Sequence, residues 1–95
     1  MSNDLAAALE LLYAQGRTFD RIIPVLKANR HAALPVLTRL LAHQDPGWRK
    51  GAASALARLR STPASALRSL VRMLRSPDAS EVIKAISALD WIPPA

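Results

Sequence analysis

Apolar residues recur along the chain at the spacing of one helical face, and turn signals divide this pattern into six segments. Within each segment, leucine, isoleucine and alanine fall three or four residues apart, which is typical of an amphipathic α-helix. We expect helices at about 3–14, 19–29, 31–43, 46–60, 63–75 and 79–91. Because the connections between them are short, consecutive helices should be antiparallel neighbours. The pattern predicts an all-α fold.

The pattern also repeats at an offset of 33 residues. When residues 34–59 are placed on residues 67–92, Leu37 falls on Leu70, Asp45 on Asp78 and Ala52 on Ala85. Such a period is typical of stacked helical hairpins, none of which buries its apolar face alone. We therefore expect one domain of three units, at about 3–29, 31–60 and 63–92, with the first unit matching only in pattern.

Helix starts are marked by capping residues and prolines. Asp45-Pro46 and Thr62-Pro63 each place a capping side chain before a proline, and Asp78 with Glu81 resembles a capping box. Pro24 should kink the second helix or shift its start. The residues expected to face inward are Ile22, Ile23, Leu26, Leu34, Leu37, Leu40, Leu41, Ala52, Ala53, Leu56, Leu59, Leu67, Leu70, Met73, Leu74, Val82, Ile83, Ile86 and Leu89.

Residues 34–59 resemble the HEAT repeat family, in particular the short HEAT-like repeats of phycobilisome lyases and many small bacterial proteins. The resemblance rests on the leucine-rich stretch that starts at Leu34, the Asp45-Pro46 turn and the basic, alanine-rich stretch that starts at Trp48. It is looser over residues 67–92. It implies an α-solenoid of three stacked antiparallel hairpins, with six helices.

The resemblance also implies a ladder of ion pairs between repeats, made by the turn aspartate and a basic residue of the second helix. Here Asp45 with Arg49 or Lys50, and Asp78 with Lys84, would form it. The ladder should end at the first unit, whose turn is Gly16-Arg17-Thr18. The alanines that recur at 52, 55, 85 and 88 are interpreted as spacers that let helices approach closely.

Positive charge is concentrated in the middle of the chain. The net charge is +6, and residues 39–75 contain eight lysines and arginines against one acid, Asp45. Arginine pairs with carboxylates and phosphates in a bidentate manner. An acidic protein partner, or nucleic acid, is therefore predicted; the alternative is that these arginines only solvate helix faces.

The sequence offers no catalytic constellation. It contains no cysteine, and His31 and His43 lie about 18 Å apart if they share one helix. We expect no metal, no cofactor and no enzymatic activity. No apolar run reaches the 18 to 20 or so residues that a membrane-spanning helix needs, and the acidic start differs from a signal peptide. A cytoplasmic location is expected.

These features favour a non-enzymatic module for protein–protein interaction or scaffolding that binds through a basic surface. Trp48 and Trp91 either plug the ends of the core or, in the case of Trp48, contribute to binding. The predicted partner-binding residues, on the second helices that usually line the concave face in this family, are Arg21, Trp48, Arg49, Lys50, Arg58 and Lys84.

Three further possibilities remain open at this point. Nucleic-acid binding, known for HEAT-like DNA glycosylases, would use a second basic patch of Arg39, Arg68, Arg72 and Arg75, although first and second helices should split the cations between two faces. The resemblance alone suggests a lyase-like or chaperone subunit. End-to-end stacking of copies is also expected, because Ala6, Ala7 and Ala8 make the outer face of the first helix only weakly polar.

Overall fold

Helices make up the regular structure of residues 22–93, the part of the chain that the computed structural model describes. The helices are α2 (Ile23–Ala28), α3 (Arg30–Leu40), α4 (Pro46–Leu59), α5 (Leu67–Met73) and α6 (Ala79–Leu89), and a 3₁₀ turn η2 (Ala64–Ala66) leads into α5. No strand occurs within these residues. The all-α prediction is confirmed, whereas the helix expected at 3–14 lies outside the described residues and the count of six stays a prediction.

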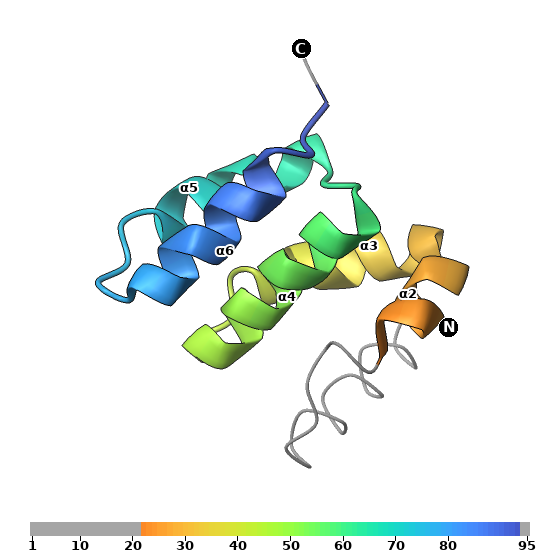
Figure 1. Ribbon diagram of the computed structural model, residues 1–95, viewed down its shortest axis with the longest axis horizontal. Helices are drawn as coiled ribbons and strands as arrows, with labels where there is room; N and C mark the ends of the chain where they lie inside the picture. The colour runs from red at the N-terminus through yellow and green to blue at the C-terminus, as the bar shows by residue number, and fades with distance from the viewer. Residues whose placement is uncertain (1–21, 94–95) are drawn as a thin grey trace.

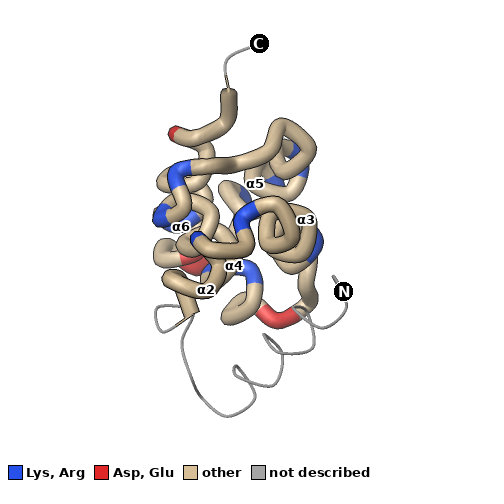
Figure 2. The backbone as a smooth tube through the Cα atoms, turned by 90° about the vertical axis from the view of Figure 1, so that its right-hand side faces the viewer, with Lys and Arg blue, Asp and Glu red and all other residues tan. Residues whose placement is uncertain are grey.

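The helices are arranged in two layers (Figures 1 and 2). Helices α3 and α5 lie in one layer, and α2, α4 and α6 lie in the other. Helix α4 packs against α3 within its own hairpin and against α6 of the next hairpin, and α6 packs in turn against α5. Two hairpins, α3–α4 and α5–α6, are thus stacked as the 33-residue period predicts.

Two helix starts follow the predicted capping chemistry. The Asp45 carboxylate accepts a hydrogen bond from the Gly47 amide at 2.8 Å, and that of Asp78 accepts one from the Ser80 amide at 2.9 Å. Pro24 lies in the first turn of α2, where its missing amide costs no helical hydrogen bond. Pro24 therefore shifts the start of this helix, one of the two predicted effects.

Two other capping predictions are wrong. The Thr62 hydroxyl is buried and donates to the Ala88 carbonyl of α6 at 2.8 Å, so it ties two segments together and does not cap α5. Glu81 does not reach back to complete a capping box with Asp78, because its carboxylate binds side chains from elsewhere. Both residues are engaged in tertiary contacts that local sequence signals do not report.

The core lies between the layers and between the hairpins. Leu26, Leu37, Leu56 and Leu70 have no exposed surface, which confirms the predicted inward faces of α2, α3 and α4 and the centre of α5. The recurring alanines at 52, 55, 85 and 88 are also fully buried, and α4 and α6 pack against each other. The interpretation of these alanines as packing spacers is confirmed.

The predicted inward face of the last hairpin is partly wrong. Leu67, Leu74, Ile83 and Ile86 are between 37% and 60% exposed. The buried side of α6 consists instead of Glu81, Ala85 and Ala88, because this side faces α4. Within the described residues, no element covers the opposite side of the α5–α6 hairpin, so its large apolar residues remain on the surface.

Candidate functional site

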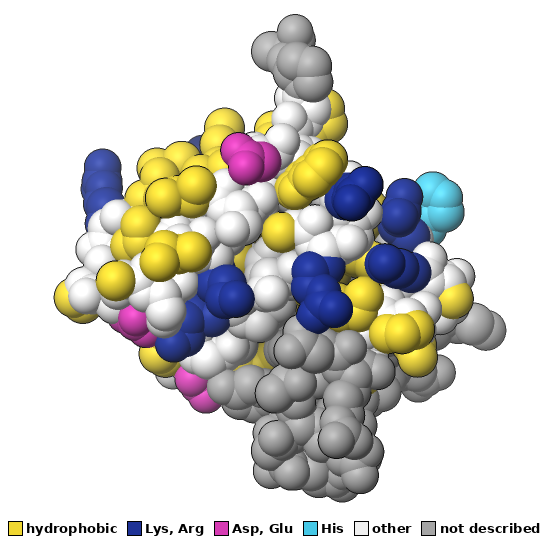
Figure 3. All heavy atoms as spheres, viewed as in Figure 1, with side chains coloured by type: hydrophobic (Ala, Val, Ile, Leu, Met, Phe, Trp, Pro, Cys, Tyr) yellow, Lys and Arg dark blue, Asp and Glu magenta, His cyan; other side chains and the backbone are white. Residues whose placement is uncertain are grey.

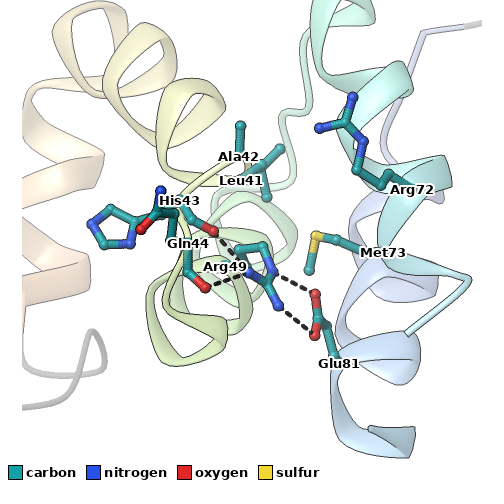
Figure 4. Close-up of a pocket in the computed structure, with 8 residues that line it drawn as sticks. All are labelled: Leu41, Ala42, His43, Gln44, Arg49, Arg72, Met73 and Glu81. Atoms are coloured by element: carbon teal, nitrogen blue, oxygen red, sulfur yellow. Dashed lines mark hydrogen bonds and ion pairs between the residues drawn. The ribbon is translucent and has the colours of Figure 1, made fainter. Parts of the chain in front are cut away.

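Arg49 of α4 lies at the junction of the two hairpins and binds two other segments at once (Figure 4). Its Nε donates to Glu81 Oε2 at 2.7 Å and its Nη2 donates to Glu81 Oε1 at 3.1 Å, which forms a bidentate pair. Its Nη1 donates to the carbonyls of His43 and Gln44 at 2.8 and 2.9 Å. The guanidinium therefore joins the start of α6 to the turn between α3 and α4.

Glu81 is the buried member of this pair. Only 2% of its side chain is exposed, and it accepts a further hydrogen bond from the Ser76 hydroxyl at 2.9 Å. The hydrogen bonds from Arg49, and then that from Ser76, lower the pKa of Glu81, while Glu81 raises the pKa of Arg49. An ionised carboxylate whose oxygens are occupied is suited to holding the hairpins together and not to transferring protons.

A second ion pair runs alongside the first. Lys50 Nζ donates to Asp78 Oδ2 at 2.9 Å and to the Ser80 hydroxyl at 3.2 Å. The hydrogen bond from Lys50, together with those from Ser80, lowers the pKa of Asp78 to about 2. Two cations of α4 thus bind two acids of the following hairpin.

The ladder of ion pairs exists, but its predicted partners are wrong. Asp45 caps α4 and does not bind Arg49 or Lys50 through its carboxylate, and Asp78 binds Lys50 in place of Lys84. Lys84 lies six residues after Asp78, which places it about 240° around the helix axis, on another side of α6. Each ion pair therefore connects two consecutive hairpins, and neither pair joins two residues of the same hairpin.

Trp48 belongs to the core of this junction. It is 7% exposed, and its ring lies 5.4 Å from that of His43 in a tilted arrangement. His43 Nδ1 accepts the Asp45 amide at 3.0 Å, so this histidine orders the turn before α4. Trp91 differs, since it is 41% exposed and its ring lies 5.7 Å from the Arg60 guanidinium.

A shallow pocket lies beside the Arg49–Glu81 pair, between the end of α3 and the α5–α6 hairpin (Figure 4). Its polar lining comes from Arg49, Glu81, Arg72, Gln44 and His43. Arg49 and Glu81 bind each other. Among residues 22–93, no group of three histidines or acids is placed to hold a metal ion. The pocket therefore holds no such metal-binding group, and its two central charges neutralise each other.

The other basic residues are divided between the two layers. Arg39, Arg68, Arg72 and Arg75 are exposed on α3, on α5 and just after α5, and no acid occurs in either helix. Figure 2 shows lysine and arginine positions on α3 and α5. Arg58 and Lys84 are exposed on α4 and α6 of the other layer. The predicted division of the cations between two faces is confirmed, and Arg21 lies outside the described residues.

Sequence reasoning missed the role of Glu81. A signal for it exists, because Glu81 precedes Ala85 and Ala88 by four and seven residues and so shares their helical face. An acid on a face of small buried residues needs a cation nearby, and Arg49 is the cation that the neighbouring hairpin supplies.

Comparison with known proteins identifies the repeat. No curated protein and no solved structure matches the chain. Within the described residues, no helix has both the length and the apolar character required to cross a bilayer. A family model for HEAT repeats matches residues 5–90, while the phycobilisome-lyase subtype stays a prediction. HEAT repeats generally act in protein–protein interaction or scaffolding and are generally not catalytic. Stacked helical hairpins and a family match over most of its length together show that this chain belongs to the HEAT repeat family.

Proposed function

We propose that this protein is a non-enzymatic scaffold that binds an acidic protein partner through the α3–α5 layer. The observation that supports the proposal is the absence of any acid from α3 and α5. Arg39 on α3, Arg68 and Arg72 on α5, and Arg75 just after α5 are all exposed to solvent. Uncompensated cations on one surface produce a positive potential that attracts an acidic partner and orients it during encounter.

The spacing of the arginines suits a polypeptide ligand. Arg68 and Arg72 lie one turn apart on α5, and Arg75 follows directly after the helix. These three residues cover about 10 Å along the helix axis. A row of guanidinium groups of this length can pair with carboxylates on successive turns of an acidic helix, each through two hydrogen bonds.

The residues first predicted to bind a partner rank below this row. Arg49 and Lys50 already bind Glu81 and Asp78, so a partner would have to break contacts between the hairpins. Trp48 is buried and would need to leave the core. Arg58 and Lys84, with Arg21, remain candidates for a secondary contact on the second-helix layer.

Nucleic-acid binding is the alternative function for the same arginines, because guanidinium groups also pair with phosphates. The general use of HEAT repeats in protein–protein interaction favours the protein partner. A lyase-like or chaperone role, and the cytoplasmic location, stay predictions from the sequence.

Fluorescence anisotropy with two labelled probes tests the proposal. One probe is a 12-residue polyglutamate peptide and the other is a 12-base-pair DNA duplex, each titrated at several salt concentrations. The variant R68E/R72E removes two cations from the α3–α5 layer. The matched control K27E/R60E makes the same charge change at two exposed residues outside that layer, neither of which is a candidate contact.

We expect the wild-type chain to bind polyglutamate, R68E/R72E to lose more than about tenfold in affinity, and K27E/R60E to lose much less. An equal loss in both variants would show that overall charge, and not this layer, governs binding. Tighter binding of DNA than of polyglutamate, with a steep dependence on salt, would favour the nucleic-acid alternative.

A further inference from the structure

The side of the α5–α6 hairpin that faces away from α4 presents a continuous apolar surface, here named the end face. It consists of Leu67, Val71 and Leu74 on α5 and just after it, with Ile83 and Ile86 on α6, and each is 37% to 60% exposed. Figure 3 shows hydrophobic side chains gathered over this hairpin. Apolar patches of this kind on a folded surface commonly mark interaction sites.

The α5 part of the end face runs beside Arg68, Arg72 and Arg75, here named the arginine row. Consecutive residues lie about 100° apart around a helix axis. The apolar part of the end face therefore lies between the core and the arginine row, and one ligand can contact both. The pattern that shows this, a buried residue followed by an exposed apolar residue and an exposed arginine, occurs three times, in Ala66-Leu67-Arg68, Leu70-Val71-Arg72 and Met73-Leu74-Arg75.

The α6 part of the end face lies opposite the side that packs on α4. Ile83 and Ile86 each precede a buried alanine, Ala85 or Ala88, by two residues, which places them about 200° around the helix axis from it. Asp90 is exposed and follows Ile86 by four residues, at the end of this side. Three cations along the α5 edge and one acid at the end of α6 make the border of the end face mainly positive.

The 33-residue repeat shows that helices pack on surfaces of this kind. Leu74 and Ile86 correspond to Leu41 and Ala53 of the preceding hairpin, which are 1% and 0% exposed. A helix is therefore the shape that fits the end face.

The ladder positions indicate that this helix does not belong to a further repeat of the same kind. Arg49 and Lys50, which bind acids of the next hairpin, correspond to Val82 and Ile83 in the last unit. A further hairpin with the ladder acids would bury them against apolar side chains without a cation, which is unfavourable. The acids of a ligand that fits must instead lie towards the arginine row.

Size and charge favour a single helix of another protein over a second copy of this chain. A stable interface between two folded proteins has about 20–30 residues on each side, whereas the end face has five large apolar residues. Each copy also carries a net charge of +6, and net charge of one sign opposes self-association.

We propose that the end face and the arginine row together bind one amphipathic, acidic helix of a protein partner. The apolar stripe of this helix lies on the end face, and acids along one flank pair with the arginine row. The inference rests on the proposed function and adds the shape and orientation of the partner. Leu67, Val71 and Leu74 have the spacing i, i+4, i+7 and cover about 10 Å, so two turns of the partner helix can match them.

Two labelled peptides of identical composition test the proposal. Both have 18 residues and contain leucine, glutamate, alanine and glutamine. In the amphipathic peptide the leucines recur every three or four residues with the glutamates along one flank, and in the scrambled peptide the leucines are spread around the helix. Fluorescence anisotropy measures the affinity of the chain for each peptide and for the polyglutamate probe.

The variants remove apolar surface without changing charge. I83S/I86S alters the α6 part of the end face. V71S and V25S form a matched pair, because both valines are exposed, by 42% and 52%, but only Val71 lies on the end face. Circular dichroism shows whether each variant keeps its helices, as expected for substitutions at exposed positions.

We expect the wild-type chain to bind the amphipathic peptide at least tenfold more tightly than the scrambled one. I83S/I86S should weaken binding of the amphipathic peptide about 30-fold, from the lost burial of two half-exposed isoleucines, and leave polyglutamate binding unchanged. V71S should weaken it about fivefold and V25S not at all. R68E/R72E should weaken binding of both the amphipathic peptide and polyglutamate.

The possible failures are distinguishable. Equal affinity for the two peptides, or unchanged peptide binding in I83S/I86S, would overturn the role of the end face, while a loss of polyglutamate binding in R68E/R72E but not in K27E/R60E would still support the proposed function. Equal losses of polyglutamate binding in those two charge variants would overturn the proposed function and the pairing with the arginine row. If the wild-type mass rises with concentration in sedimentation velocity, and that of I83S/I86S does not, the occupant is a second copy and the proposal is wrong.

Discussion

Replacement of Arg49 by methionine should destabilise the fold strongly. The change leaves the Glu81 carboxylate buried with only the Ser76 hydroxyl as a hydrogen-bond donor, and it leaves the His43 and Gln44 carbonyls without the guanidinium. Loss of one partner of a buried ion pair typically costs about 3–5 kcal/mol. Because 24% of the Arg49 side chain is exposed, we expect a value near the lower end, about 3 kcal/mol.

Thermal and urea unfolding, followed by circular dichroism, measure this loss. For a domain of this size, each 1 kcal/mol lowers Tm by about 4–8 °C, so R49M should unfold more than about 10 °C below wild type. The matched control is K50M, which removes the neighbouring but more exposed pair with Asp78. Its effect should be small, because exposed pairs contribute little to stability.

A double substitution separates the two causes of the loss. R49M/E81L removes the buried charge together with its partner, and it should recover more than half of the stability lost in R49M. If R49M is as stable as K50M, the Arg49–Glu81 pair does not hold the hairpins together. If R49M/E81L is no more stable than R49M, the loss comes from the His43 and Gln44 carbonyls and not from the unpaired carboxylate.

Two further predictions concern the stability of the fold at low pH and the buried hydroxyl of Thr62. The pKa values of Asp78 and Glu81 are lowered in the folded state, that of Asp78 from 3.8 to about 2. Both residues therefore stabilise the fold above the pKa of the unfolded chain, and the urea midpoint should fall as pH drops from about 4 towards 2. In D78N this fall should be smaller; an unchanged slope would show that Asp78 does not contribute. T62V should lose about 1 kcal/mol, because the hydroxyl that donates to the Ala88 carbonyl is buried. The control T38V, which loses only a bond within α3, should lose less in the same unfolding assay, and equal losses would contradict a linking role for Thr62.

Local chemistry explains which parts of the fold were predictable. Asp45-Pro46 determines the start of α4 through one side-chain acceptor and one fixed backbone angle, both of which are properties of adjacent residues. The same signals failed at Thr62, because its hydroxyl binds Ala88, 26 residues away. A capping motif indicates which nearby backbone groups a side chain is able to bind, and tertiary contacts decide whether it binds them.

The same difference between local and tertiary interactions explains which parts of the candidate site were predictable. The charge of the α3–α5 layer follows from composition, because no fold can place an acid on helices that contain none. The partners of Arg49 and Lys50 do not follow from composition, since several acids have suitable spacing along the chain. Only the offset between stacked hairpins brings α4 beside Asp78 and Glu81 and leaves Lys84 on another side.

Helix α6 shows why hydrophobicity alone misassigned a buried face. It has two apolar stripes, one with Ala85 and Ala88 and the other with Ile83 and Ile86, and the larger residues gave the stronger signal. Close packing against α4 requires small side chains at the contact, so the alanines are buried and the isoleucines are exposed. In a stacked repeat, the alanine stripe therefore marks the face of the helix that packs against the neighbouring hairpin. A second stripe of large apolar residues, on a helix whose small face is already occupied, indicates a surface to which a partner helix can bind.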